Sequence, residues 1–382
     1  MTSASRTDTR RSDPPIKALA RNAYRGANAV RARLLARRAK PGEAPRVWYG
    51  GARAGDAGGP LVKVARLHEA FPEANGMFNL LYTLSNTPYL PRSALAAMKM
   101  RGTAIVHNQN GVFYPGWYAS DWQAQNARMA DAYHLADHVF WQSNFCRRCA
   151  DRFLGKREGP GEVLFNAVDI SLFAPETEKA PRSEPFTFLL TGKIQNHLAY
   201  RLEDTIAGLA TARAQGLDAQ LLIAGIIDDG ARAAAYTAAQ DADIAARVRF
   251  TGPYTQAEAP ALYRSADAYV MTKHADPCPN TVIEAMACGL PVAYVASGGV
   301  PELVGPNAGT GVAADDDWEK PFRPAPEALG AAMRRVAEHQ AAMSTAARAR
   351  AEAAFSLDAW LDRHATVFGD ALRRAAARAN SC

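Results

Sequence analysis

Short β-rich runs alternate with longer helical stretches along most of this chain, and the whole cycle occurs twice. This alternation is typical of a parallel sheet covered by helices. The first cycle predicts strands at residues 46–49, 78–83, 103–107, 138–142 and 162–165. The second cycle predicts strands at residues 186–190, 220–224, 247–251, 268–271 and 291–294.

A chain of 382 residues exceeds what one hydrophobic core supports, so two domains are expected. We place an α/β domain at residues 46–166, a proline-containing linker at 167–185 and a second α/β domain at 186–354. Residues 355–382 should form a final helix, and crossing back to the first domain is one option for it. The fold class is therefore α/β, with two Rossmann-like parallel sheets facing across a cleft. The glycines after the first strand do not read G-x-G-x-x-G, which disfavours a dehydrogenase.

A basic segment, residues 1–45, precedes the first cycle. It holds eleven Arg and Lys against three Asp and Glu, a balance of +8 in a chain whose total is +6. The remainder is close to neutral and lacks the continuous basic face of a nucleic-acid-binding protein. Apolar residues between Ile16 and Leu35 recur at helical spacing among arginines, which predicts a basic amphipathic helix. Two interpretations stay open: an extension packed on the body, and peripheral contact with an anionic membrane.

The composition also bears on the cellular compartment. No run of about 18 apolar residues is present, and the first residues lack the apolar core of a secretory signal. We expect a cytoplasmic protein, peripheral at the inner face of the membrane if the basic segment attaches there. The five cysteines do not form a disulfide framework, and the Cys146–Cys149 CxxC has no second pair at zinc-ligand spacing. Reduced thiols and no metal site are expected.

Residues 274–292 join an expected strand, a loop, a helix and another strand. Asp276 falls on the loop and Glu284 about one turn into the helix, so both carboxylates can face the cleft. Asn280 and Thr281 stand at the helix N-terminus, whose free N–H groups and positive dipole end suit a diphosphate. A carboxylate inside that helix can accept both hydroxyls of a ribose. The alternative is a capping box from Thr281 to Glu284, in which the carboxylate bonds only the backbone.

The same segment resembles the signature of the retaining glycosyltransferases of family four. That signature is an acidic residue, seven residues, then Glu-Ala-Met-Ala-x-Gly-x-Pro-Val, which begins here at Glu284. Residues 163–169 resemble the interdomain passage of that family, and residues 298–304 resemble its later glycine turn and helix. The resemblance covers most of residues 46–370. It implies the two-domain GT-B architecture, with the donor site in the C-terminal half.

The resemblance also implies roles for the two carboxylates. The second acidic residue of the family binds the donor ribose and the first contacts the transferred sugar, which points to Glu284 and Asp276. Two departures stand out: Asp276 is one methylene shorter than the usual Glu, and Pro279 lacks a backbone N–H that the family often offers. Asn280 is the substitute hydrogen-bonding group.

Metal-independent members of the family oppose the charge of the leaving diphosphate with two basic residues after the first strand of the C-terminal domain. The resemblance therefore implies Lys193 and Arg201, although a solvent-exposed arginine at a helix start is the alternative for Arg201. Gly192 and Gly225 are the candidate donor-binding glycines. Gly225 would leave room for the base or ribose, unless it is a plain turn glycine.

The acceptor is expected on the N-terminal domain, whose loop at residues 107–118 is rich in amides and aromatic rings suited to sugar hydroxyls and ring faces. The family places a histidine that contacts the transferred sugar after this strand. His107 and Asn110 are the candidates, and by register Asn110 is nearer, whereas His107 can also be a structural residue. Gly59 fits either a backbone contact with the ligand or a turn in which Pro60 starts a helix.

These observations predict a retaining, metal-independent glycosyltransferase without a bound cofactor. It would move a hexose-type sugar from a nucleoside-diphosphate sugar to a carbohydrate or lipid-linked acceptor, in polysaccharide or glycoconjugate synthesis. Two other classes share the two-domain plan. One is a non-hydrolysing nucleotide-sugar epimerase or a phosphorylase, and the other is a catalytically silent carbohydrate- or nucleotide-binding protein.

Overall fold

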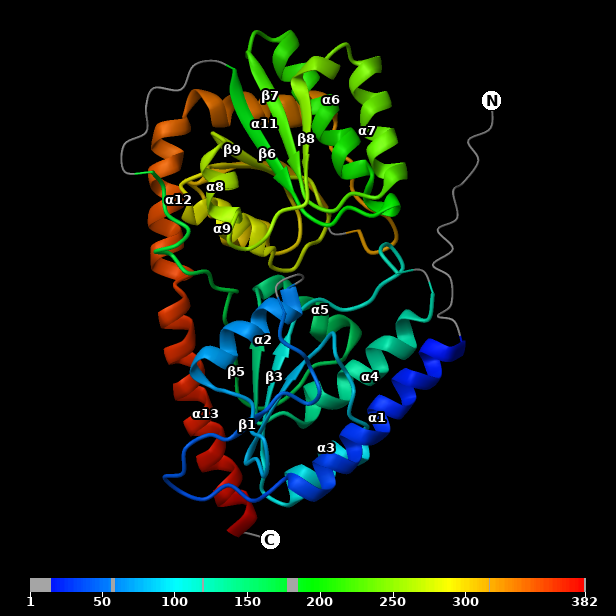
Figure 1. Cartoon of the computed structure of the whole chain (residues 1–382), viewed down its shortest axis with the longest axis vertical. Helices are drawn as coiled ribbons and strands as arrows, with labels where there is room; N and C mark the ends of the chain where they lie inside the picture. Colours follow the sequence, from blue (N-terminus) through cyan, green and yellow to red (C-terminus); the bar gives the residue numbers. More distant parts are fainter. Residues whose placement is uncertain (1–14, 56–58, 119, 177–184, 316, 381–382) are drawn as a thin grey trace.

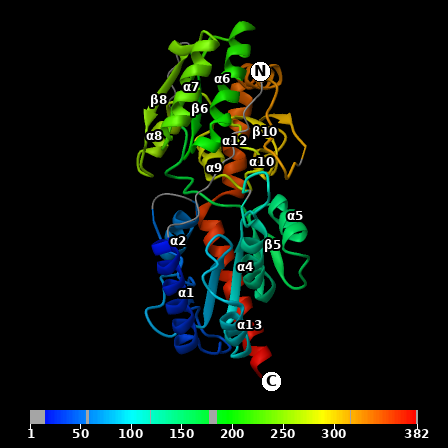
Figure 2. The same ribbon diagram turned by 90° about the vertical axis from the view of Figure 1, so that its right-hand side faces the viewer.

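The computed structural model describes residues 15–55, 59–118, 120–176, 185–315 and 317–380. It contains two parallel sheets, each in its own lobe, arranged one beyond the other along the long axis (Figures 1 and 2). The prediction of two parallel-sheet α/β domains is therefore confirmed. Residues 1–14 of the basic segment, residues 177–184 of the linker and residue 58 lie outside the described residues.

The first sheet has five parallel strands that neighbour one another in chain order. They are β1 (Val47–Trp48), β2 (Leu80–Leu84), β3 (Ala104–Gln109), β4 (His138–Trp141) and β5 (Gly161–Val163). The connecting helices are α2 (Gly59–Ala70), α3 (Arg92–Met100), α4 (Trp122–Leu135) and α5 (Asn144–Phe153). Along β2 the side chains alternate between the two faces: Leu81 packs with α3, α4 and α5, whereas Leu80 and Tyr82 pack with α2.

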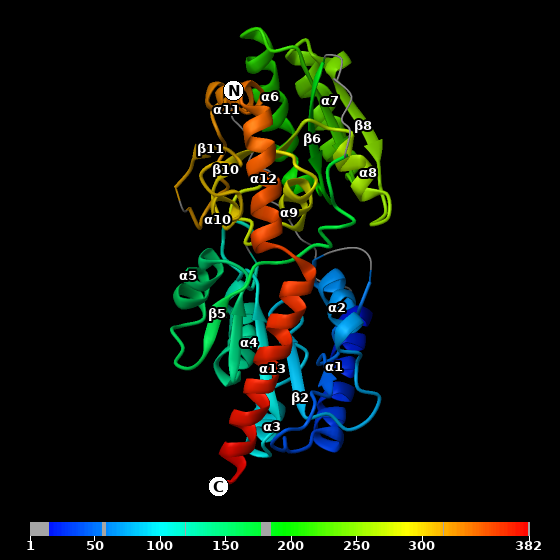
Figure 3. The same cartoon turned by 90° about the vertical axis from the view of Figure 1, so that its left-hand side faces the viewer.

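The C-terminal helix completes the second face of this sheet. α13 (Leu357–Asn380) follows α12 (Gln340–Ala354), and the two helices run end to end along both domains (Figure 3). Phe368 and Leu372 of α13 are buried in the same core as Leu80 and Tyr82 of β2. The last helix therefore crosses back onto the first domain and supplies part of its core.

The N-terminal helix α1 (Pro15–Leu35) also belongs to the packed first domain, which differs from the expectation of an arm outside it. Ala32 and Ala39 are fully buried, Ala36 forms a parallel bridge with Phe78, and the Tyr24 hydroxyl donates to the Gly51 carbonyl at 2.6 Å. The interpretation as a packed extension is correct for these residues. The helix buries Asn28 and Ala32 but leaves Leu19, Val30 and Leu34 exposed, so its large apolar residues did not mark the buried face.

The second sheet has six parallel strands in the order β11-β10-β9-β6-β7-β8. They are β6 (Phe186–Thr191), β7 (Ala219–Ala224), β8 (Val248–Gly252), β9 (Ala268–Met271), β10 (Val292–Ala296) and β11 (Gly309–Ala313). The first strand of this domain, β6, lies in the middle of the sheet. Strands β7 and β8 follow on one side of it, and β9, β10 and β11 follow on the other. The strand order therefore reverses between β6 and β9, and such a point is where ligands bind in open α/β sheets.

Two helical layers cover this sheet. One layer contains α6 (Tyr200–Ala214), α7 (Asp229–Asp241) and α11 (Pro326–Glu338), and the other contains α8 (Ala259–Arg264), α9 (Asn280–Ala287), α10 (Val300–Val304) and α12. Short 3₁₀ turns lie at Asn196–Leu198 and Ala245–Arg247. In the described part of the chain, no helix combines the length and the apolarity that a membrane span requires.

Two elements differ from the sequence prediction. The edge strand β11 was not predicted, because its sequence Gly-Thr-Gly-Val-Ala is poor in apolar side chains and the strand is only partly buried. Its Gly309 lies so close to the Val292 carbonyl that a Cβ atom would collide with it, and this explains the glycine. The break between the helices α11 and α12 at His339 was not predicted either.

Candidate functional site

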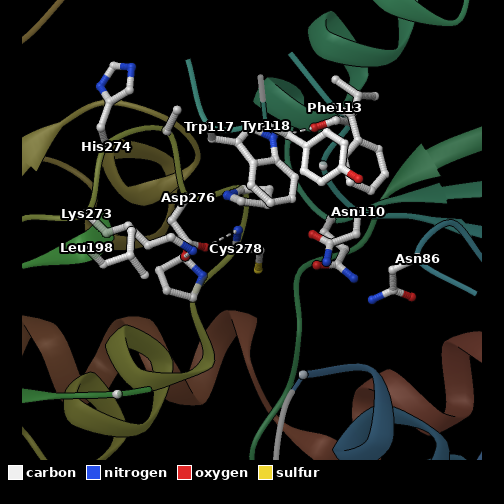
Figure 4. Close-up of a pocket in the computed structure, with 18 of the residues that line it drawn as sticks. Asn86, Asn110, Phe113, Trp117, Tyr118, Leu198, Lys273, His274, Asp276 and Cys278 are labelled. Carbon is white, nitrogen blue, oxygen red and sulfur yellow. Dashed lines mark hydrogen bonds and ion pairs between the residues drawn. The ribbon is translucent and has the colours of Figure 1, made fainter. Parts of the chain in front are cut away.

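A cleft of about 1260 Å³ lies between the two domains. The carboxyl ends of β3 and β4 line it on one side, and the loops after β6 and β9 line it on the other. Figure 4 shows this arrangement: Asp276 and Lys273 come from the second domain, and Asn110, Trp117 and Tyr118 face them from the first. The cleft therefore brings together segments that are more than 150 residues apart.

Asp276 lines the cleft, and its carboxylate is held within its own loop. Lys273 Nζ donates to Oδ2 at 2.7 Å, and the Cys278 N–H donates to Oδ1 at 3.2 Å. The Asp276 carbonyl in turn accepts the Gly299 N–H at 2.9 Å. A Cβ atom on Gly299 would collide with the Pro277 carbonyl, so only glycine allows the turn to lie this close to the loop. The glycine turn thus holds the loop that carries Asp276.

The N-terminus of α9 opens into the cleft, as the diphosphate interpretation requires. Asn280 and Thr281 both line the cleft, and the buried Asn280 Oδ1 has no hydrogen-bond partner among the described residues. Pro279 occupies the cap position and makes no side-chain cap. The capping-box interpretation is wrong, because α9 begins at Asn280 and Thr281 is already inside the helix.

Glu284 does not line the cleft but lies beneath it, 3% exposed. One carboxylate oxygen accepts from the Tyr263 hydroxyl at 2.9 Å, and the other lies 3.9 Å from the guanidinium of Arg66 on α2. Burial raises the pKa of Glu284 to about 7, although Arg66 and Tyr263 both act in the opposite direction. The structure thus joins Glu284 to the first domain, and its ribose contact stays a prediction.

Arg201 is buried in the wall of the cleft, with 4% of its surface exposed. The alternative of a solvent-exposed arginine is therefore wrong. Among the described residues, its guanidinium makes only long contacts, to the Thr191 carbonyl at 3.5 Å and the Met271 sulfur at 3.9 Å. Its Nε has no partner in the described part of the chain. A buried cation without a carboxylate partner is unfavourable unless a ligand supplies negative charge.

Gly192 and Lys193 belong to the loop that follows β6. Both line the cleft, as Arg201 of α6 does. Lys193 is exposed. Gly225 does not line the cleft: it has φ +124°, and a Cβ atom there would collide with the Gly192 carbonyl. These observations support the alternative of a turn glycine, because Gly225 allows the loop after β6 to approach β7. Its role in leaving room for a base or ribose stays a prediction.

His107 is fully buried and does not line the cleft, which corrects its assignment to the acceptor site. Its Nδ1 lies 2.8 Å from the Thr83 hydroxyl and its Nε2 lies 3.0 Å from Gln109 Oε1. Burial lowers the pKa of His107 to about 4, so the ring is neutral. Asn110 does line the cleft, and its buried Oδ1 has no partner among the described residues. Gly59, the first residue of α2, lines it as well.

The cleft residues that the sequence analysis missed include Lys63 of α2, and Lys273 and His274 on the loop that carries Asp276. The sequence contained a signal that could have identified Lys63, because it is the one charged residue in the apolar run Leu61-Val62-Lys63-Val64. Lys273 had none, because its pairing with Asp276 depends on the conformation of the loop. Arg66, the partner of Glu284, had none either, because the two residues are far apart in sequence.

Two polar contacts close the edge of the cleft between the domains. Ser143, which caps α5, donates from its hydroxyl to the Pro277 carbonyl at 2.8 Å. The Glu302 carboxylate accepts the backbone N–H groups of Asn144 and Phe145 at 2.7 and 2.8 Å. The start of α5 is therefore held by the glycine turn and signature loop of the other domain.

Two parallel-sheet α/β domains with a ligand cleft between the carboxyl ends of their strands define the GT-B class. Solved structures agree on this fold. HepE from Anabaena in complex with UDP matches with a TM-score of 0.58 and 18% identity over 82% of each chain. Sucrose-phosphate synthase from Thermosynechococcus elongatus matches with a TM-score of 0.57 and 21% identity over 81% of this chain and 76% of that one.

Residues 185–339 match the family model described as Glycosyl transferases group 1. A D-inositol 3-phosphate glycosyltransferase from Mycolicibacterium paratuberculosis is 30% identical over 224 residues, 56% of this chain and 48% of the relative. One from Paenarthrobacter aurescens is 27% identical over 167 residues, 41% of each chain. These matches span less than half of the relatives' length. The resemblance seen in the signature is confirmed for residues 185–339, which match the family model of the group 1 glycosyltransferases, and the fold of the chain is GT-B.

Proposed function

We propose that this protein transfers a hexose-type sugar from a nucleoside-diphosphate sugar to a carbohydrate or lipid-linked acceptor, with retention at the anomeric carbon. Arg201 carries the proposal. A guanidinium that is buried, faces a cleft and lacks a carboxylate partner in the described chain fits a ligand diphosphate. Lys193 and the N-terminus of α9 add positive charge at the same place.

The names of similar proteins support a nucleotide-sugar donor. HepE from Anabaena was solved in complex with UDP-glucose, and it shares the fold over 82% of this chain. The relatives with curated names are glycosyltransferases for D-inositol 3-phosphate. By analogy we propose that this chain binds a nucleoside diphosphate between Arg201, Lys193 and α9, with the sugar directed toward Asp276.

The proposed reaction takes place on one face of the sugar. The bond from the anomeric carbon to the diphosphate oxygen breaks as the acceptor oxygen bonds to the same face. The acceptor proton passes to the departing diphosphate, whose negative charge Arg201 and Lys193 stabilise. Both oxygens of Asp276 are engaged within its loop, which disfavours this residue as a covalent nucleophile. Product analysis that finds inversion at the anomeric carbon would exclude this mechanism.

Arg201→Met tests the diphosphate site, because it keeps the length of the side chain and removes the charge. We expect the affinity for the preferred nucleotide among UDP, GDP and ADP to fall about 10- to 100-fold, the value of a charge-assisted hydrogen bond. Stability without ligand should not fall, since an unpaired buried cation is removed. Arg249→Met, at an exposed position of β8, is the matched control. Equal nucleotide affinity in the Arg201 variant and the control would contradict the site.

Incubation with nucleotide-sugars separates transfer from the other reactions possible on this fold. A transferase should release free nucleoside diphosphate only when an acceptor is present. An epimerase would convert the nucleotide-sugar without any acceptor, and a phosphorylase would require inorganic phosphate. Nucleotide binding without turnover over a broad acceptor panel would indicate a silent binding protein.

A further inference from the structure

Lys63 is a buried cation at the floor of the cleft that the proposed diphosphate site does not use. It stands on α2 of the first domain, is 6% exposed and lines the cleft. Its Nζ donates to Asn108 Oδ1 at 2.9 Å. An ammonium group has three donors, so this bond leaves two N–H groups for another partner.

The charge of Lys63 is not balanced by an anion in the described part of the chain. The ionisable groups that interact with it electrostatically are Arg66, which is also cationic, the thiols of Cys146 and Cys278, and the His364 imidazole, whose pKa burial lowers to about 3. Burial raises the pKa of both thiols far above neutral, so they carry no charge. Burial also lowers the pKa of Lys63 to about 7. The protein thus keeps a lysine where its charged form is unfavourable, in a position that faces a ligand cleft.

The amides beside Lys63 add a second unfilled position. Asn108 Oδ1 also accepts from Gln142 Nε2 at 2.8 Å, so it is fully used. Asn166, 6% exposed, donates from Nδ2 to the Cys278 carbonyl at 3.0 Å. Its Oδ1 is buried, has no partner among the described residues and belongs to a residue that lines the cleft. The floor therefore offers free donors on Lys63 and a free acceptor on Asn166.

We propose that Lys63 binds an anionic group, a carboxylate or a phosphate, on a sugar substrate, while Asn166 accepts a hydrogen bond from a hydroxyl of the same molecule. A neutral sugar could fill the hydrogen bonds but would leave the buried charge unbalanced. This inference rests on the proposed function and specifies its substrate class. The group belongs either to the transferred sugar or to the acceptor, because Cys278, which contacts Asn166, is two residues from Asp276.

The test compares ligand pairs that differ in charge. UDP-glucose against UDP-glucuronate probes the transferred sugar, and inositol against inositol phosphate, each with UDP present, probes the acceptor. At pH 7 we expect at least about tenfold tighter binding of the anionic member in one pair, as charge-assisted hydrogen bonds imply. The pair that shows the preference identifies the source. Equal binding of both members in both pairs would overturn the proposal.

Lys63→Met should abolish that preference, whereas Lys156→Met, at an exposed position outside the cleft, should retain it. A preference that survives Lys63→Met would overturn the proposal. A purely structural lysine would show the opposite pattern, in which the variant melts earlier and affinity for the neutral and anionic members falls equally. If Lys63→Met does not fold, Lys63→Gln gives the same comparison with a polar side chain.

The pH dependence gives a readout that needs no variant. Between pH 7 and 9 the empty site should lose the Lys63 proton, so the preference should fall at least about tenfold. The ionisable groups that interact with Lys63 are Arg66, Cys146, Cys278 and His364. The cation, the neutral thiols and the neutral imidazole do not change charge in this range. A constant preference over this range would overturn the proposal. The affinity for UDP itself reports on the proposed function, so the two ideas can fail separately.

Discussion

Glu284 joins the two domains beneath the cleft. It is buried under the cleft, bonded to Tyr263 of its own domain and paired with Arg66 of the other. Burial holds its pKa near 7, well above that of an exposed glutamate. The folded protein therefore binds a proton at this position over a pH range in which the unfolded chain has released it.

Glu284→Gln should remove a pH-dependent part of the stability. Because the folded pKa is raised, the stabilisation by protonated Glu284 is complete below about pH 4.5 and is lost as the pH rises to about 7. Relative to the Gln variant, the wild type should lose up to about 3 kcal/mol of unfolding free energy across this window. Urea unfolding at a series of pH values measures it, with exposed Glu338→Gln as control. A difference in unfolding free energy that does not change with pH would contradict the raised pKa of Glu284.

The same variant tests the ribose contact. If Glu284 receives the ribose hydroxyls, Glu284→Gln should lower nucleotide affinity about 10- to 100-fold while the protein stays folded. Calorimetric titration with the preferred nucleoside diphosphate measures this change. Unchanged affinity would leave Glu284 with Tyr263 and Arg66 as its only partners.

The start of α5 is an element whose position depends on the other domain. The Glu302 carboxylate accepts two backbone N–H groups and the side-chain amide of Asn144 there. A carboxylate at a helix N-terminus is stabilised by the unpaired N–H groups and by the helix dipole. The hydrogen bonds of this one side chain therefore hold the two domains together at the edge of the cleft.

Glu302→Ala should loosen the domains without unfolding either of them. Several charge-assisted bonds are lost, each worth about 1.5–3 kcal/mol, although water can replace part of this at an exposed edge. We expect a larger radius of gyration in solution scattering without ligand, and unchanged secondary structure. Glu338→Ala, which removes only an exposed pair with Arg334, should leave the radius unchanged. An unchanged radius in the Glu302 variant would contradict its role in holding the domains.

One face of α1 exposes large apolar side chains. Leu19, Val30 and Leu34 are 73%, 54% and 72% exposed, and their spacing places them on one face of the helix. Arg33 is also exposed. We propose that this face contacts an anionic membrane, where each basic residue contributes about 1 kcal/mol. Deleting residues 1–45 is a poor test, because Ala32 and Ala39 belong to the core.

Val30→Glu with Leu34→Glu is the sharper test. Both positions are exposed, so the melting temperature of the double variant should change little. Its sedimentation with anionic liposomes should be weaker than that of the wild type, and sedimentation of the wild type should weaken as the salt concentration rises. Ile226→Glu, exposed on the second domain, is the control and should sediment like the wild type. Equal sedimentation of the double variant and the wild type would exclude this face.

At the scale of the whole molecule, α13 makes the first domain depend on the end of the chain. Phe368 is fully buried and packs edge-on against Phe71 and Tyr82, whose ring centroids lie 4.9 and 5.8 Å away. His364, also fully buried, lies 3.1 Å from the Tyr82 hydroxyl. The last residues of the sequence thus complete the core that the first strands begin.

Phe368→Ala should therefore destabilise the first domain by about 3–5 kcal/mol, as aromatic truncations in cores do. Hydrogen exchange should show the loss of protection in β2 and β3, with less change in β6 and β7. Thr366→Ala, at an exposed position of the same helix, should have little effect. Equal loss of protection in both sheets would show that the domains unfold as one unit.

Much of the fold followed from local patterns. Ten of the strands were predicted from short apolar runs that alternate with helical stretches. A buried strand requires such a run, and an amphipathic helix requires apolar residues at helical spacing, so both are visible in the sequence. The segment from Asp276 to Val292 likewise carried the resemblance to the retaining glycosyltransferases of family four. β11 was missed because a glycine-rich edge strand has little side-chain burial and therefore little pattern.

The environment of each side chain was decided by the tertiary structure alone. His107 and Arg201 both end up buried, yet only the arginine faces the cleft, and neither outcome can be read from the neighbouring residues. Helix α2 contacts segments that are more than 40 residues away in sequence. These contacts pair Arg66 with Glu284 and bury Lys63 beside Asn108. Charge, burial and partnership arise where distant segments meet. The sequence by itself therefore determined most of the elements and the family resemblance, and only the packing of the elements decided which residues form the site.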